Sequence, residues 1–161
     1  MNDTIPRKTP PTGRIRFGFI VLILGYLIFV LGAEPYIFGL DRSPVTGFVQ
    51  ITVFLIGLGI LCTGGYLALN AAWNGRQRSI VADIGIRLVA TGYVIAVTAG
   101  LADVFGLGSH PFPNVPSFGF VQAIGVMLGE ITIAIGFIIF IPYPARRKSN
   151  NSLTEETRYS G

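Results

Sequence analysis

The sequence predicts an all-α membrane protein, in which four transmembrane helices are formed by two tandem helical hairpins. Three observations lead to this prediction. The composition is 51% apolar and only 12% charged, and the mean hydropathy is +0.63. Four apolar runs of roughly 20 residues have the length that a helix needs to cross a bilayer. The third observation is that the two halves of the chain resemble each other.

Charge, proline and hydropathy divide the chain into five segments: a basic tail at 1–16, a first transmembrane hairpin at 17–69, a cytoplasmic loop at 70–79, a second transmembrane hairpin at 80–141 and a disordered tail at 142–161. Within the hairpins the helices are expected at 17–33, 48–69, 80–101 and 118–141. Ser79 is the expected N-cap of the third helix. The first run is expected to remain as a span, because it is longer than the apolar region of a usual signal peptide.

Lysine and arginine are distributed unevenly between the two ends of the expected helices. Ten of them fall on the side of the tails and the middle loop, one falls on the other side, and Arg87 lies within a span. Because positive residues are retained in the cytoplasm, both termini are expected there, with the protein in the cell membrane. This bias also explains the net charge of +4, so a nucleic-acid partner is not expected and the lipid bilayer is.

An internal repeat relates the two halves. Residues 38–40 (FGL) recur as 105–107 at a shift of 67, and residues 47–50 (GFVQ) recur as 119–122 at a shift of 72. Each unit starts and ends on the same side, which predicts a parallel duplication with an axis along the membrane normal. Glycines recur every seven residues within the spans, and such stripes favour close packing of transmembrane helices. The glutamines that end the two GFVQ motifs are expected to bond to each other across this axis.

The candidate intramembrane polar site consists of Asp83, Arg87, Thr91 and Glu130. Asp83, Arg87 and Thr91 are spaced by four residues, so they share one face of the third helix. Glu130 falls near the middle of the fourth helix, where an ionised side chain costs about 2.5–3.5 kcal/mol or more. Such residues need a partner, so the sequence predicts that Arg87 and Glu130 approach each other. They either fix the packing of the bundle, act as a proton or ion relay or anionic-ligand site, or bind another subunit.

The inventory of reactive residues argues against several classes of protein. One cysteine and one histidine exclude a dithiol centre and bis-histidine haem ligation, and the acidic residues near His110 match no metal-ligand spacing. No cofactor, metal or catalytic residue is therefore expected. The sequence favours a non-enzymatic structural or accessory component of a membrane assembly, in contact with itself or with other subunits. The alternative is a small transporter or channel that uses an Arg87/Glu130 pair, followed by an enzyme acting on lipid or quinone.

Overall fold

The structure, a computed structural model, describes residues 12–39, 47–74, 76–107 and 119–142. This described part contains four long helices and one short 3₁₀ helix: α1 (Thr12–Ala33), η1 (Pro35–Phe38), α2 (Phe48–Ala72), α3 (Ile80–Gly100) and α4 (Phe120–Phe140). The expectation of four long helices is therefore confirmed. Each of the four has the length and the apolar composition needed to cross a membrane.

The helix boundaries differ from the expected ones mainly at the start of α1. This helix begins at Thr12, so Arg14 and Arg16 belong to it rather than to the expected basic tail. Arginine is a good helix former, and it extends the apolar helix without breaking it. Ser79 caps α3 as predicted, because its Oγ accepts a hydrogen bond from the backbone nitrogen of Ala82 at 3.2 Å. The rest of the N-terminal tail and residues 143–161 lie outside the described residues.

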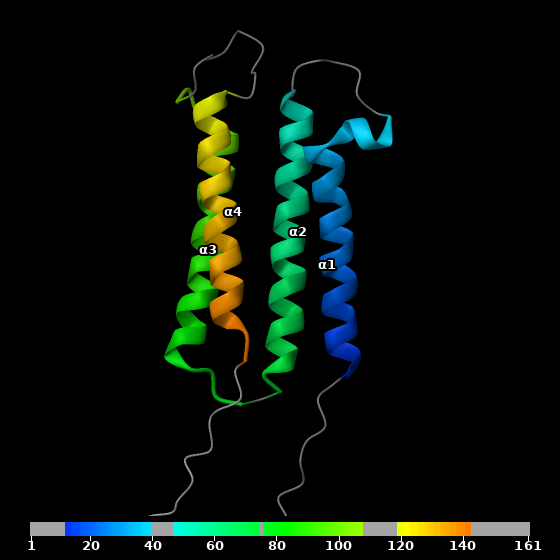
Figure 1. Ribbon diagram of the computed structural model, residues 1–161, viewed down its shortest axis with the longest axis vertical. Helices are drawn as coiled ribbons and strands as arrows, with labels where there is room; N and C mark the ends of the chain where they lie inside the picture. Colours follow the sequence, from blue (N-terminus) through cyan, green and yellow to red (C-terminus); the bar gives the residue numbers. More distant parts are fainter. Residues whose placement is uncertain (1–11, 40–46, 75, 108–118, 143–161) are drawn as a thin grey trace, which may run out of the picture.

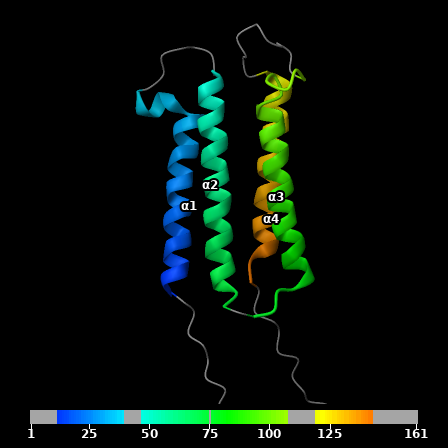
Figure 2. The ribbon, with the colours of Figure 1, turned by 180° about the vertical axis from the view of Figure 1, so that it is seen from behind.

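The four long helices run alternately up and down and form two hairpins, α1–α2 and α3–α4, which lie side by side (Figure 1). The view from behind shows the same arrangement, with α1 at one edge of the molecule (Figure 2). The starts of α1 and α3 and the ends of α2 and α4 meet at one end, here called the lower end as in Figure 1. The helices pack most extensively within each hairpin, and α2 makes the main contact between the hairpins.

Glycine stripes bring the backbones within each hairpin into direct contact. A Cβ added to Gly57 of α2 would lie 2.6 Å from the Cα of Phe29 in α1. A Cβ added to Gly129 of α4 would lie 2.6 Å from the carbonyl oxygen of Gly92 in α3, and one added to Gly92 would meet the oxygen of Gly129 at the same distance. No side chain fits between backbones this close, so glycine sets the spacing of both pairs.

The two hairpins use corresponding positions for these contacts. Gly25 of α1 lies against Leu61 of α2, while Gly92 of α3 lies against Ile133 of α4. Gly92 follows Gly25 by 67 residues, and Ile133 follows Leu61 by 72 residues. These are the same two shifts that relate the matching motifs in the sequence.

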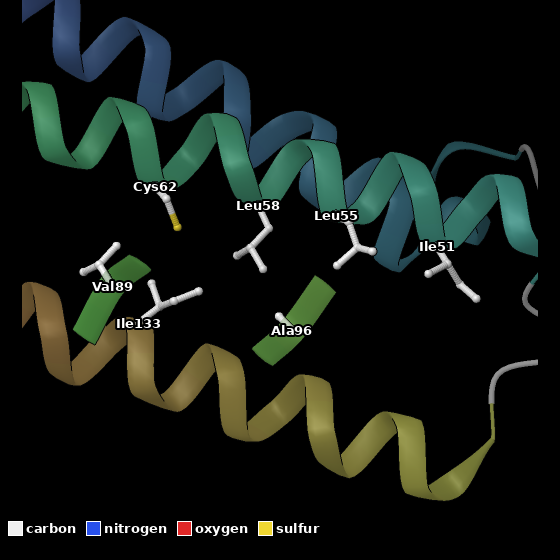
Figure 3. Packing of buried hydrophobic residues seen from close by; sticks show 7 residues of the cluster. All are labelled: Ile51, Leu55, Leu58, Cys62, Val89, Ala96 and Ile133. Atoms are coloured by element: carbon white, nitrogen blue, oxygen red, sulfur yellow. The ribbon is translucent and has the colours of Figure 1, made fainter. Parts of the chain in front are cut away.

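Side chains rather than backbones fill the interface between the hairpins. Buried residues along α2 face Val89 and Ala96 of α3 and Ile133 of α4 (Figure 3). The α2 residues of this cluster are Ile51, Leu55, Leu58 and Cys62. Small residues on α2 also receive rings from the second hairpin, since a Cβ on Gly59 would meet the hydroxyl of Tyr93 at 2.7 Å.

Aromatic residues join the hairpins at the lower end. The indole nitrogen of Trp73, just after α2, donates a hydrogen bond to the carbonyl oxygen of Phe140 at 3.1 Å. This carbonyl belongs to the last turn of α4, where it has no partner within its own helix. Phe140 is only 1% exposed, and its ring stacks with those of Tyr66 and Trp73 at centroid distances of 6.1 and 6.5 Å. Trp73 therefore has a structural role, since it joins the end of α2 to the end of α4.

Candidate polar site within the apolar helices

Three of the four candidate residues lie on one exposed face of α3. Asp83, Arg87 and Thr91 are all exposed, and the Thr91 hydroxyl donates to the backbone oxygen of Arg87 at 2.8 Å. At 3.6 residues per turn this face points away from Gly85 and Gly92, which contact α4. Asp83 lies about 4.5 Å and Arg87 about 10.5 Å along the helix from its first residue, at a rise of about 1.5 Å per residue.

Glu130 lies at the midpoint of α4, about 15 Å along the helix from either end. It is partly buried and lines a cleft of about 290 Å³ between the two hairpins. The opposite wall is formed by Gly32 of α1 and by Ile51 and Phe54 of α2, and Met127 lies one turn away on α4 itself. The carboxyl group is thus placed in apolar surroundings beside the first hairpin.

The structure does not bring Arg87 and Glu130 together, contrary to the approach that the sequence suggests. Among the described residues neither side chain forms an ion pair, and Asp83 does not pair with Arg87 there either. The reason is rotational. Glu130 follows Gly129, which faces α3, so its side chain is turned about 100° from that contact and toward the first hairpin. Arg87 is turned away from α4 altogether.

The burial of two polar residues, Asp103 and Gln122, was not predicted from the sequence. Asp103 and Gln122 are 5% and 6% exposed, and in the described part of the chain Asp103 Oδ1 and Gln122 Nε2 have no hydrogen-bond partner. The Gln122 Oε1 atom accepts from the backbone nitrogen of Gly119 at 2.7 Å, so this glutamine caps its own helix rather than bonding to Gln50 as expected. Asp103 follows Ala96 by seven residues and so continues the buried face of α3, a signal that the sequence contained.

The Cys62 thiol and the Tyr93 hydroxyl lie at a mostly apolar cleft between the hairpins. This cleft has a volume of about 340 Å³ and is lined by Cys62, Tyr66, Val89, Tyr93 and Phe137, among others. The Tyr93 hydroxyl donates to the backbone oxygen of Leu55 at a long 3.4 Å, and no base lies beside the thiol among the lining residues. Within the described ranges no cluster of His, Cys, Asp and Glu could hold a metal ion, and His110 lies outside those ranges.

The chain was compared with protein-family models, curated proteins and solved structures. No family model, no curated protein and no solved structure matches the chain.

Proposed function

We propose that this chain is a multi-pass integral membrane protein that serves as a non-enzymatic structural or accessory component of a membrane assembly. The exposed apolar surface of the helices is the observation that supports a location in the membrane. Large apolar side chains are exposed on all four helices, for example Ile20 (63%), Ile56 (52%), Val94 (61%) and Ile138 (58%). Soluble monomers rarely expose contiguous apolar patches beyond a few hundred Å². Lipid is the solvent that fits these surfaces.

The lower end of the bundle is the proposed cytoplasmic side of the cell membrane. Four of the basic residues assigned there, Arg14, Arg16, Arg76 and Arg78, are exposed at this end. Ten basic residues belong to the tails, the first turns of α1 and the middle loop, against one in the other loops. This excess supports cytoplasmic termini under the positive-inside rule.

The proposed architecture is a parallel duplication of one hairpin. Matching motifs at shifts of 67 and 72 residues support it, as do glycine contacts at the same shifts. In the first hairpin, the position equivalent to Asp83 is Arg16, whereas Ile20 is equivalent to Arg87 and Leu58 to Glu130. The second hairpin therefore carries the polarity that distinguishes the two units.

The exposed face formed by Asp83, Arg87 and Thr91, here called the polar face, is the proposed docking surface for a partner helix. Intramembrane charges are costly unless they are paired or reach water, and these have no ion-pair partner within the described chain. A neighbouring subunit or a second copy with complementary polar groups would supply one. The alternative role in transport through an Arg87/Glu130 pair is not proposed, because the two side chains lie on different faces.

Site-specific photocrosslinking tests this function. A photoreactive phenylalanine analogue replaces Thr91 in the polar face, and the matched control replaces Leu24, which occupies the equivalent position of the first hairpin and is 52% exposed. In membranes of the native cell, we expect irradiation to give a discrete protein adduct from position 91 and lipid adducts alone from position 24. Lipid adducts alone from both positions would refute the docking face. Extraction of the protein by alkaline carbonate would refute its integral membrane character.

A further inference from the structure

A cleft at the lower end of the second hairpin combines a polar wall with an apolar one. It has a volume of about 600 Å³, within the range of about 300–1,000 Å³ that ligand sites usually occupy. The loop that joins α2 to α3 supplies Arg76, Gln77 and Ser79. The apolar wall is formed by Val81 at the start of α3 and by the end of α4, including Ile138. We call this the Arg76 cleft.

The Arg76 side chain is held in place with most of its hydrogen-bonding capacity unused. Its Nε donates to the backbone oxygen of Trp73 at 3.3 Å, and Trp73 is itself bonded to the end of α4. A guanidinium carries five N–H donors, so four have no acceptor among the described residues and can serve a ligand. In the part of the chain that the structure describes, no acidic residue lines the cleft, and Asp83 lies about 200° around α3 from Val81.

The apolar wall continues directly from this cation onto the exposed surface of the helices. Val81 and Ile138 are 59% and 58% exposed, and Ile141 is 42% exposed. A ligand that fits must therefore join an anionic group to an apolar chain. Membrane phospholipids with a net negative headgroup have this structure, and basic residues near the membrane surface attract them.

We propose that the Arg76 cleft binds an anionic phospholipid of the cytoplasmic leaflet. The phosphate contacts the Arg76 guanidinium and the Ser79 hydroxyl, whose hydrogen is free because Ser79 Oγ acts as acceptor in the cap of α3. The acyl chain follows Val81 and Ile138 along the groove between α3 and α4. The inference rests on the proposed membrane location, and it adds a lipid class and a binding site.

The first hairpin supports this proposal with a smaller cleft at the same end. That cleft has a volume of about 360 Å³ and also combines an arginine, Arg14, with the apolar residues Phe17 and Leu67. Leu67 and Ile139 of the Arg76 cleft occupy equivalent positions at the shift of 72. An amphipathic cleft with one arginine is thus present at the lower end of each hairpin.

A photoactivatable phosphatidylglycerol, with its reactive group in the acyl chain, tests the site in the full-length protein in lipid nanodiscs. Adducts are mapped to peptides by mass spectrometry. We expect labelling of residues 81 and 138–141, and about a fivefold loss of it in R76Q, the factor expected for one basic residue near the lipid surface. The control R16Q removes an exposed arginine of the same end that lines neither cleft, and we expect no change.

Competition experiments identify what the cleft recognises. Excess phosphatidylglycerol should suppress the labelling, whereas phosphatidylcholine and glycerol 3-phosphate should leave it unchanged. Suppression by glycerol 3-phosphate would mean a site for free phosphate esters, and equal suppression by phosphatidylcholine would mean no headgroup selectivity. Either result, or equal labelling of R76Q and R16Q, would overturn the proposal. If the protein is folded in nanodiscs but is labelled only outside the Arg76 cleft, the lipid site is refuted and the membrane location stands. If the protein does not enter nanodiscs, the proposed function is refuted as well.

Discussion

The glycine contacts predict that two neighbouring glycines of α2 respond differently to the same substitution. Gly57 and Gly59 lie two residues apart, and each becomes alanine in a separate variant. The new Cβ at Gly57 would lie 2.6 Å from the Cα of Phe29, in the backbone of α1. The new Cβ at Gly59 would lie 2.7 Å from the Tyr93 hydroxyl, at the free end of a side chain. Only the second obstacle can move without shifting a helix.

The expected magnitudes follow from these distances. Carbon atoms pack at about 3.5–4.0 Å, so Gly57→Ala must separate α1 from α2 by about 1 Å. Overpacking of this kind costs about 1–3 kcal/mol, and the higher helix propensity of alanine returns up to ~1 kcal/mol. We therefore expect Gly57→Ala to lower the free energy of unfolding by about 1–2 kcal/mol. Gly59→Ala should change it by less than ~0.5 kcal/mol, because it displaces only a long hydrogen bond, 3.4 Å, from Tyr93 to Leu55.

The assay is reversible unfolding in mixed micelles of dodecyl maltoside and sodium dodecyl sulfate, followed by far-ultraviolet circular dichroism. Wild type serves as the reference, and the two variants control for each other because both make the same chemical change in the same helix. Equal destabilisation of the two variants would refute the reasoning. Stabilisation by Gly57→Ala would show that the backbones of α1 and α2 are not in contact at this level.

Three further predictions use the same unfolding assay or simple labelling. Glu130→Leu should leave the protein as stable as wild type or more so, because it removes a costly unpaired carboxyl. When Glu130→Leu is combined with Arg87→Ile, the changes in unfolding free energy should add within about 0.5 kcal/mol. Clear non-additivity would mean that the two side chains interact. Trp73→Phe should cost about 1 kcal/mol by removing the bond to the end of α4, and an unchanged midpoint would contradict that role. In a background without the native cysteine, an impermeant maleimide should label Tyr36→Cys in intact cells and should label Gln77→Cys only after the cells are opened; the reverse pattern would invert the proposed topology.

The number and type of the long elements could be predicted from the sequence because each depends on a long apolar run. The start of α1 could not, since residues 12–16 are mostly polar and precede the apolar run from which the helix was predicted. Helix ends are the least certain part of any such prediction for this reason. The cap at Ser79 was accessible because it needs only local residues.

The candidate site shows a different limit. Arg87 and Glu130 lie at nearby depths along their helices, but depth does not determine how each helix is rotated about its axis. The glycines determine this rotation, since Gly92 and Gly129 face each other. The seven-residue stripes were visible in the sequence, and used as a rotational reference they would have separated Arg87 from Glu130. The same seven-residue spacing would have indicated the burial of Asp103, which follows the buried Ala96 by seven residues.

The contrast between backbone contacts within hairpins and side-chain contacts between them has a consequence for the order of assembly. Each hairpin holds a complete set of close contacts of its own, so the α1–α2 unit can reach its final packing before the second unit has been synthesised. Docking then requires only that Tyr93 and the other side chains of the second unit enter the surface of α2. We expect each hairpin to behave as one cooperative unit in native-state hydrogen exchange, with the two units opening at different free energies.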